Sequence, residues 1–568
     1  MPYRITLALL VVTSLAAAGT QELEDYCSRA EKFGFSGAVL VAKDGKILLQ
    51  KGYGYANRAQ QVANTERTLF EIASATKPFT AAAILKLEEQ GKLSTDDPIG
   101  KHLPGVPAGL QKVTVYHLLT HTSGMPRTAA GGRGPNLEVA VRAYLAPGRA
   151  RKEGERFEYW NGGYALLAGI VERVTGGTYM DYCRKHLFEP AGMQKTGFTG
   201  DTHLNDEPMA SGYSDGRAVR TAVGHPYRSY GWQYRGMGGI VTSVLDLYQW
   251  DRALYGDKVL SARTKEKYFK PFLGKYACGW SVVETPRKTR KITHGGDVRG
   301  FHTYFARFPD EDAVVIVTGN VDGIPMWSVG GSLESILFDE ERKWPVPPKT
   351  VQLKAAQLEA LAGTYELSAG HELVVRPDGK AILVGAVGQR AVDLLQARTR
   401  FDERPDRFKR ESRIARDVVE GVATGDVEVL RGVMMRGIPE SWPDAVKRSI
   451  WPKHVEQWGA FRSVRVIGAG PAGRGRVRII LALAHAEGTP RCRVELQNGR
   501  LAIFDLKGPE FLESVRCLPV SKERFARFAW VGPSPPPLQF ERKGGKVTAV
   551  VIKPVFGPAV RCKRIDAR

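Results

Sequence analysis

Residues 68–89 read TLFEIASATKPFTAAAILKLEE. Thr68–Ile72 is typical of a short strand, and helical periodicity from Phe79 to Glu89 predicts a helix that ends before Gly91. Ser74-Ala-Thr-Lys77 opens this helix. Pro78 is tolerated there because the amides of a helix's first turn have no partners within the helix. The stretch therefore places a serine and a lysine where a strand gives way to a helix.

Ser74 and Lys77 form an S-x-x-K pattern whose spacing predicts a reactive pair. Side chains three residues apart lie on one helical face, about 5–6 Å apart at Cβ. The positive end of the helix dipole favours a developing alkoxide on Ser74, and Lys77 acts as a base if burial removes its proton. Such a string is expected about once or twice by chance in a chain of this length. Alone, it favours the alternative of a helix-capping serine and a surface lysine.

A second pattern, Tyr159-Trp160-Asn161, follows Phe157-Glu158. A tyrosine two residues from an asparagine on a tight loop can aim both side chains into one cleft. A phenolate beside a cationic lysine has a lowered pKa and can relay protons, and Asn161 can hydrogen-bond Lys77 and a substrate amide. The alternative is an aromatic loop that packs on the core.

The third pattern is His294-Gly295-Gly296-Asp297. Glycines let the backbone of a strand approach a ligand closely and offer an amide to an oxyanion. We expect the backbone N–H groups of Ser74 and Asp297 to form that oxyanion hole. The alternative is a β-bulge with an exposed histidine.

Together the three patterns resemble the serine beta-lactamase and penicillin-binding-protein superfamily, and specifically the class C beta-lactamase-like branch of hydrolases. Further motifs match that family in order and spacing at residues 117–124 (HLLTHTSG), 163–169 (GYALLAG), 190–193 (PAGM), 238–243 (GGIVTS), 246–247 (DL) and 279–280 (GW). The resemblance implies that Ser74 is the acylated nucleophile, Lys77 its activator, Tyr159 the general base and acid, and Asn161 a positioning residue. It also implies that His294 takes the place of the family's third-motif lysine.

Two departures from the family pattern bear on the substrate. Trp160 stands where beta-lactamases of this branch usually carry a small residue, and His294-Gly-Gly stands where they usually carry Lys-Thr-Gly. A lysine there supplies a permanent cation for the carboxylate of a β-lactam, whereas a histidine is mostly neutral near pH 7. Variants with histidine look more like the esterases and D-amino-acid peptidases of the branch, so we expect poor penicillin hydrolysis.

Strand and helix patterns divide the chain into two parts. Strands are predicted at residues 37–42, 47–49, 303–308 and 313–318, with helices between them at 79–89, 163–174 and 245–254. Strands at both ends of a helical middle imply an α+β sandwich whose sheet is completed by both ends of the segment, here residues 24–342. A proline-rich linker follows at 343–350.

The remaining residues, 351–568, are predicted to form an accessory, mainly β region. Its predicted strands at 361–365, 373–375, 382–384 and 540–549 resemble the lipocalin-like β-domains often appended to these hydrolases. Predicted helices at 414–435 and 444–459, with strands from 464 to 504, form an α+β insertion at about 411–533 that resembles an NTF2-like cone. The expected fold class is thus α+β: a beta-lactamase-like domain, with an antiparallel sheet and a helical subdomain, followed by this accessory region.

Composition and charge bound the class of protein. Hydrophobic residues make up 43% of the 568 residues and charged residues 25%, which excludes wholesale disorder. The net charge is +22, of which the last 218 residues carry +14. A basic surface of this kind is usually only solvated, but it also suits an anionic envelope surface, without specific nucleic-acid binding.

The first residues are typical of an export signal. Arg4, the apolar run Ile5–Ala18 and its small-residue end predict a cleaved signal peptide over residues 1–19. No later segment reaches the roughly 18 uncharged apolar residues that a membrane span needs. We therefore expect a periplasmic or extracellular protein that is soluble after cleavage.

Six cysteines allow fifteen complete pairings, and the sequence favours neither disulfides nor buried free thiols. They contain no C-x-x-C, which argues against a zinc ribbon. His117 and His121 share the spacing of helical metal ligands, but no glutamate follows His117, so packing or capping is the better interpretation. No metal or organic cofactor is predicted.

Two rival functions are considered. Gly212-Tyr-Ser-Asp-Gly216 matches the G-x-S-x-G elbow of α/β-hydrolases, but neither a buried strand before it nor a helix after it is predicted. A catalytically silent envelope peptide-binding protein is the alternative of another class, and intact Ser74, Lys77 and Tyr159 argue against it. The predicted function is an exported serine hydrolase that cleaves an ester, amide or peptide, of the esterase or D-amino-acid peptidase type. The alternative within the family is a beta-lactamase or penicillin-binding carboxypeptidase.

Overall fold

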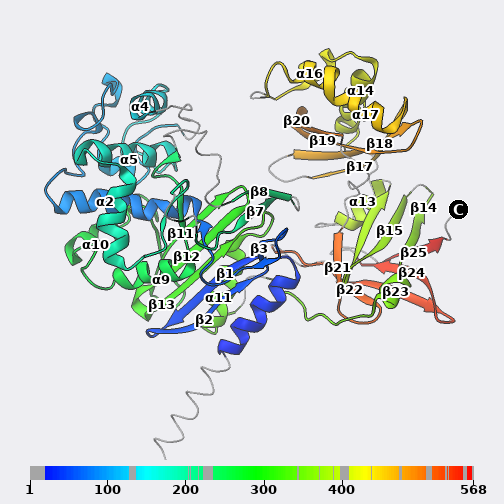
Figure 1. Ribbon diagram of the computed structural model, residues 1–568, viewed down its shortest axis with the longest axis horizontal. Coiled ribbons are helices and arrows are strands. Elements are labelled where there is room, and N and C mark those ends of the chain that lie inside the picture. The colour runs from blue at the N-terminus through cyan, green and yellow to red at the C-terminus, as the bar shows by residue number, and fades with distance from the viewer. Residues whose placement is uncertain are drawn as a thin grey trace, which may run out of the picture. The chain divides into compact units, whose positions relative to one another are not determined.

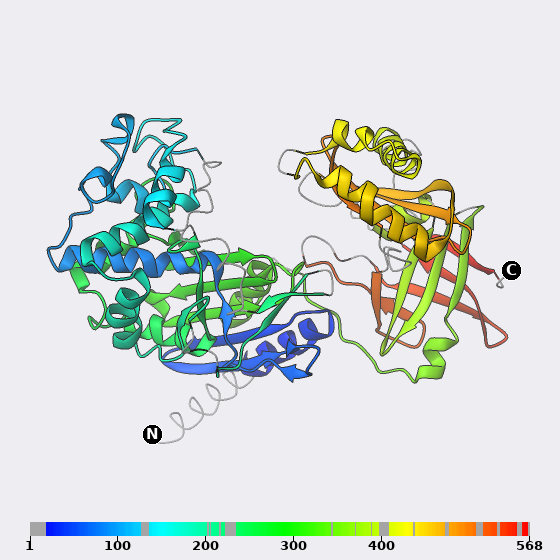
Figure 2. The same cartoon turned by 45° about the horizontal axis from the view of Figure 1, so that its top comes forward.

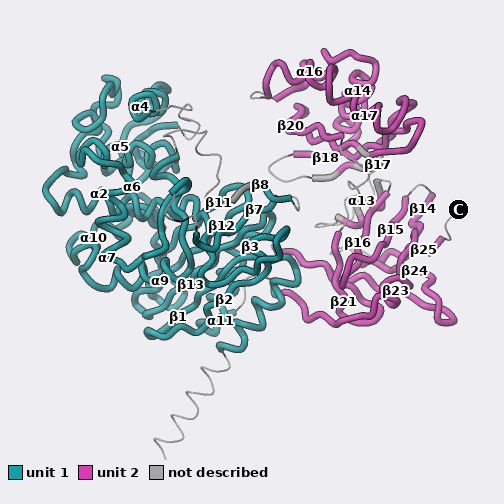
Figure 3. The backbone as a smooth tube through the Cα atoms, viewed as in Figure 1, with its two compact units in different colours: residues 1–346 teal, residues 347–568 magenta. Residues whose placement is uncertain are grey.

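The computed structural model of the chain forms two compact units, residues 1–346 and 347–568 (Figure 3). The boundary between Val346 and Pro347 lies in the segment predicted as a linker. The structure describes residues 19–565 except for 127–135, 202–203, 205, 215–216, 222–233, 342–344, 370, 388, 397–407, 436–437, 472–475, 507–514, 531–533, 535 and 554–558. Residues 1–18 of the predicted signal peptide thus lie outside the described residues. No helix among the described residues is long and apolar enough to cross a membrane.

A six-stranded antiparallel sheet forms the centre of the first unit (Figure 1). Its strands, in spatial order, are β10 (Ser281–Glu284), β11 (Arg290–Val298), β12 (Phe301–Phe308), β13 (Ala313–Gly319), β1 (Gly37–Lys43) and β2 (Lys46–Tyr53). The pairing of β1 with β13 confirms that both ends of the unit complete one sheet. The strands predicted at 37–42 and 47–49 form a hairpin: β1 pairs with β2 across Asp44 and Gly45, both with positive φ, as a type I′ turn requires.

Helices cover both faces of this sheet (Figure 2). On one face, Glu334 of α11 (Met326–Leu337) accepts a hydrogen bond from Tyr304 of β12. On the other, Asp251 of α9 (Val244–Ala253) binds Arg307 of β12 at 2.8 Å. Because successive side chains of a strand alternate between faces, residues 304 and 307 must contact opposite layers.

The helical subdomain lies beside the sheet and contains α2 (Lys77–Glu89), whose first eleven residues include only one that is not buried. Such a helix needs no polar stripe because other elements surround it. The other helices of this unit include one at residues 19–32 and α3 (Val115–Leu119), α4 (Leu137–Leu145), α5 (Asn161–Thr175), α6 (Tyr179–Cys183), α7 (Glu189–Ala191) and α10 (Ala262–Phe269). The smaller strands are β3 (Tyr55–Asn57), β4 (Val62–Ala63), β5 (Phe70–Glu71), β6 (Gly197–Phe198), β7 (Ser211–Ser214), β8 (Arg217–Thr221) and β9 (Ile240–Thr242).

The second unit contains a closed barrel around its own core, which includes Tyr365, Phe525 and Phe540. Its strands are β14 (Gly363–Ser368), β15 (His371–Asp378), β16 (Ala381–Val387), β21 (Val515–Pro519), β22 (Arg524–Ala526), β23 (Leu538–Lys543), β24 (Lys546–Ile552) and β25 (Val560–Ile565). The α+β and mainly β fold classes predicted for the two parts are therefore confirmed.

Between β16 and β21 the chain forms a separate four-stranded sheet with its own helices. First comes α13 (Gln389–Gln396), whose Ala391, Leu394 and Leu395 belong to the core of the barrel. The elements of the separate sheet and its helices are α14 (Lys409–Thr424), α15 (Glu428–Val433), α16 (Trp442–Ala445), α17 (Trp451–Trp458), β17 (Phe461–Pro471), β18 (Arg476–His485), β19 (Arg491–Gln497) and β20 (Arg500–Asp505). The single helix predicted over 414–435 is wrong: Gly425, with φ of 82°, ends α14 in a left-handed cap.

All six cysteines are buried and unpaired, so the disulfide alternative is not realised. Burial raises the pKa of each of these thiols, and for Cys278 it reaches about 12. They pack as small apolar residues.

Candidate active site

Ser74 lies on a short 3₁₀ turn, Ala73–Thr76, which leads directly into α2. Ala73 has a φ of 48°, a costly conformation for a residue with a Cβ. Lys77 is completely buried, and its Nζ lies 3.0 Å from Ser74 Oγ. The alternative of a surface lysine is therefore wrong, and the two side chains meet as their spacing predicts.

Burial lowers the pKa of Lys77 well below its ordinary value. None of the ion pairs recorded for the described residues involves Lys77, although its Nζ also donates to the carbonyl oxygen of Met237 at 2.9 Å. A neutral amine keeps a lone pair, so it can accept the proton of Ser74 while its own N–H remains bonded to that carbonyl.

Tyr159 and Trp160 point to different surroundings. Lys77 Nζ lies 4.9 Å from the centre of the half-buried Tyr159 ring. Trp160 is buried against Tyr144, with ring centres 6.2 Å apart. The alternative of an aromatic side chain packed on the core therefore holds for Trp160, whereas Tyr159 lies beside Lys77. Its role as acid and base stays a prediction.

Asn161 is the first residue of α5, and its side chain is exposed. Among the described residues, the recorded hydrogen bonds of Lys77 go to Ser74 and Met237, not to Asn161. The expected Asn161–Lys77 bond is thus not present in this structure.

The strand that carries the third pattern passes directly against the serine turn. β10 pairs with β11 only as far as Thr293, so beyond it this edge of β11 faces the turn instead of a strand. A Cβ on Gly296 would lie 2.0 Å from the Ile72 carbonyl oxygen and 3.1 Å from Ala75 N. Only a glycine permits this approach. A Cβ on the exposed Gly295 would meet nothing nearer than the Thr303 carbonyl oxygen at 3.3 Å.

His294 is buried, so the alternative of an exposed histidine is wrong. Its Nδ1 donates to the Gly295 carbonyl at 2.6 Å, which leaves Nε2 to accept from the Tyr276 hydroxyl at 3.1 Å. Burial, with the nearby Lys77, lowers the pKa of His294 to about 3 despite the carbonyl contact. The imidazole is therefore neutral near pH 7.

Asp297 turns its side chain outward and holds a second histidine. Its carboxylate lies 2.8 Å from His302 Nδ1, and Asp322 lies 2.8 Å from His302 Nε2. Burial opposes charge on His302, but the two carboxylates raise its pKa to about 9. The oxyanion role predicted for the Asp297 amide, beside that of Ser74, stays a prediction.

Two aromatic side chains near the site had no assigned role in the predicted mechanism. Tyr276 binds His294, and His121 lies under the site, its ring centre 4.3 Å from that of Tyr159. His121 accepts the Trp160 N–H at 3.2 Å and has a φ of 56°. The HLLTHTSG motif marks His121, whereas no local pattern marks Tyr276.

Two other motifs of the sequence, one around His117 and one around Ser214, have structural roles or lack the geometry of an active site. His117 caps α3 through Thr114, which confirms the capping interpretation, and no metal-binding group of three acidic, histidine or cysteine residues occurs among the described residues. Ser214 ends β7, which pairs with β8 in a hairpin, so the strand-to-helix elbow of an α/β-hydrolase is not formed. Residues 215 and 216 of that pattern lie outside the described residues.

Comparisons with known proteins agree with this geometry. The family model described as Beta-lactamase matches residues 29–326. Penicillin-binding protein 4* of Bacillus subtilis (strain 168) is 30% identical over 410 residues, covering 65% of this chain and 88% of that protein. Putative penicillin-binding protein PbpX of the same strain is 36% identical over 303 residues, covering 53% and 74%.

A solved structure, the octameric penicillin-binding protein homologue from Pyrococcus abyssi, aligns with a TM-score of 0.51 at 22% identity. The alignment covers 85% of this chain and 98% of that one. At this identity the likeness concerns the fold.

Proposed function

The chain belongs to the beta-lactamase family of serine hydrolases, and on that premise we propose that it cleaves an ester or amide bond through an acyl-enzyme on Ser74. The observation that carries this proposal is the 3.0 Å contact between Ser74 Oγ and the fully buried Lys77 amine. Burial lowers the pKa of this amine well below its ordinary value, which favours the neutral form, and a neutral amine in contact with a hydroxyl can accept its proton.

In the proposed reaction, Lys77 takes the Ser74 proton as the oxygen attacks the substrate carbonyl. The backbone N–H groups of Ser74 and Asp297 stabilise the tetrahedral oxyanion, and the close approach of Gly296 to the serine turn supports this arrangement. Tyr159 and Lys77 deliver the proton to the leaving group. They then activate the water that hydrolyses the acyl-enzyme.

His294 favours an esterase or D-amino-acid peptidase over a beta-lactamase. A neutral imidazole that is engaged on both nitrogens offers no cation to a substrate carboxylate. A penicillin-binding carboxypeptidase is the second candidate, since two similar proteins carry the name penicillin-binding protein.

Export and attachment to an anionic envelope surface are part of the same proposal. The signal-like residues 1–19 and the surplus of +14 in the last 218 residues support them. Cell fractionation tests export, and a protein found only in the cytoplasm would contradict it. Sedimentation with anionic and with neutral vesicles tests attachment, and equal binding to the two kinds of vesicle would contradict it.

Intact-mass spectrometry of the wild type and of Ser74→Ala tests the chemistry. Each is incubated with a short-chain activated ester, a D-alanyl peptide and a penicillin, and product is followed in parallel. Ester or peptide turnover that depends on Ser74 is expected, and a lasting penicillin adduct would favour the second candidate. A folded protein that reacts with none of the three, and that a fluorophosphonate fails to label, would be a binding protein instead.

A further inference from the structure

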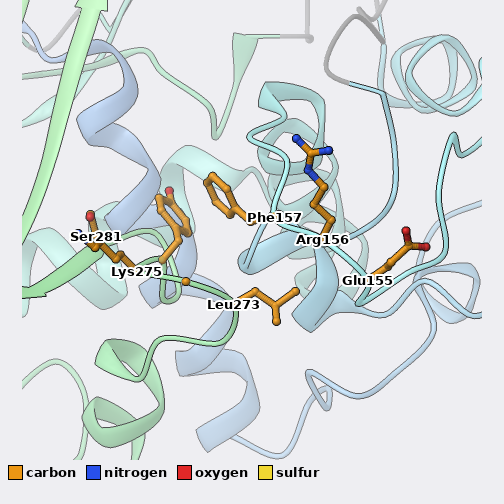
Figure 4. Close-up of a pocket in the computed structure, with 8 residues that line it drawn as sticks. Glu155, Arg156, Phe157, Leu273, Lys275 and Ser281 are labelled. Carbon is orange, nitrogen blue, oxygen red and sulfur yellow. The ribbon is translucent and has the colours of Figure 1, made fainter.

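A pocket beside the Ser74 site has no role in the mechanism above. It has a volume of about 360 Å³ and is lined by residues 155–157, residues 273–276 and Ser281 (Figure 4). Tyr276 belongs to both places, because it lines the pocket while its hydroxyl lies 3.1 Å from His294 Nε2. Phe157 also lines it, two positions before Tyr159. Tyr276 therefore connects the wall of this pocket to the residues around Ser74.

The pocket carries more positive than negative charge. Arg156 and Lys275 are exposed, and no ion pair or side-chain hydrogen bond is recorded for either cation in the described part of the chain. The single acidic lining residue, Glu155, accepts the backbone N–H of Lys152 at 3.2 Å. Two cations without a carboxylate partner among the described residues are suited to bind one from a ligand.

Apolar groups form the rest of the wall. The rings of Phe157 and Tyr276 lie 5.3 Å apart between centres, and Leu273 lines the same space. Figure 4 shows Arg156 and Phe157 on one segment and Leu273 and Lys275 on the facing one. Pockets that bind small organic groups combine apolar walls with a few polar groups that fix orientation.

The position of the charge matters because His294 is neutral. On the strand beside Ser74 the imidazole supplies no cation, whereas Arg156 and Lys275 supply two in the adjoining pocket. The arrangement suits a substrate whose negative charge is separated from the scissile carbonyl by an apolar link.

We propose that this pocket is a substrate subsite for a carboxylate-bearing substituent. Arg156 and Lys275 bind the carboxylate, and Phe157, Leu273 and Tyr276 cover the apolar link that joins it to the scissile bond. The inference rests on the proposed hydrolase function and names its substrate class: esters or amides with a remote carboxylate.

Two matched pairs of esters test the subsite. In the first pair the leaving group differs, 3-carboxyphenyl butyrate against 3-carbamoylphenyl butyrate. In the second the acyl part differs, 4-nitrophenyl hydrogen adipate against its methyl ester. The measured quantity is the ratio of kcat/KM for the anionic ester to kcat/KM for the neutral ester. A general loss of activity in a variant lowers both kcat/KM values equally and therefore cancels in this ratio.

Arg156→Gln and Lys275→Gln should each lower this ratio about tenfold in one of the two pairs, which is the effect of one charge-assisted hydrogen bond. Lys270→Gln is the control, since it removes an equal charge from an exposed residue outside the pocket lining. Ratios that equal those of the control in both pairs would overturn the subsite.

Binding to Ser74→Ala keeps the two proposals separable. Calorimetry with the intact esters should show tighter binding of the anionic member of one pair, and Arg156→Gln in this background should weaken it about tenfold. If the wild type hydrolysed none of the esters, the hydrolase proposal would fail, and equal binding of anionic and neutral members would overturn the subsite independently.

Discussion

His294 and His302 lie on neighbouring strands of one sheet, and their surroundings shift their pKa values in opposite directions. His294 is buried near Lys77, no carboxylate of the described residues contacts it, and its pKa falls to about 3. His302 is bound by Asp297 and Asp322, and its pKa rises to about 9. Burial alone disfavours the charged form of both.

The difference shows that nearby opposite charge decides which form of a buried titratable group is favoured in this fold. Where burial is offset by opposite charge, as at His302, the surroundings favour the cation. Where it is not offset, as at Lys77 and His294, burial lowers the pKa and favours the neutral form. Ser74 lies beside the groups of the second kind.

Substitutions of Ser74 and of the residues beside it, Lys77 and Tyr159, should have the largest effect on turnover. Ser74→Ala should abolish turnover, and Lys77→Ala or Tyr159→Phe should each lower kcat by several orders of magnitude, because residues of such a unit act non-additively. Ester hydrolysis measured with each purified variant checks this. Turnover retained by Ser74→Ala would place the reaction elsewhere.

The adjacent glycines of β11 test the contact between the strand and the serine turn. Gly296→Ala would place a Cβ 2.0 Å from the Ile72 carbonyl oxygen, so β11 must move away from Ser74. We expect kcat/KM to fall about 100-fold, as for other ångström-scale displacements of catalytic groups. Gly295→Ala is the matched variant, and its 3.3 Å contact should cost far less. Equal losses in the two variants would contradict the argument.

The pH dependence of stability should show the opposite shifts directly. His294 is neutral when folded, so its contribution to the free energy of unfolding is present above pH 6.5 and is lost as the pH falls toward 3. His302 is charged when folded, so its contribution is present below pH 6.5 and is lost as the pH rises toward 9. Each slope approaches about 1.4 kcal/mol per pH unit.

Urea unfolding of the wild type, His294→Gln and His302→Gln between pH 4 and 9 measures these slopes. The difference between wild type and His294→Gln should shrink on acidification. For His302→Gln the difference should shrink on alkalinisation. Slopes of the same sign in the two variants would refute the comparison.

Local patterns predicted much of this site, and long-range contacts supplied the rest. The Ser74–Lys77 contact follows from the spacing of three residues and is present. The glycines of the third pattern predicted a close backbone approach, but the groups that Gly296 approaches, Ile72 and Ala75, lie in a distant segment of the sequence. The Met237 carbonyl and Tyr276 come from segments whose approach depends on tertiary packing, so no motif indicates them. The break of the predicted 414–435 helix has a local cause, Gly425, which apolar periodicity outweighed in the sequence-based assignment.

His294→Lys tests what the neutral histidine contributes to substrate choice. A lysine at this place would bring a permanent cation to the strand next to Ser74, and it would lose the Tyr276 contact that fixes the imidazole. We expect a modest shift of relative kcat/KM toward carboxylate-bearing β-lactams and away from neutral esters. The shift should be modest because burial at this position lowers the pKa of the new amine and so disfavours its charged form. Unchanged relative rates, in a variant that still hydrolyses neutral esters, would show that His294 serves only to position Tyr276.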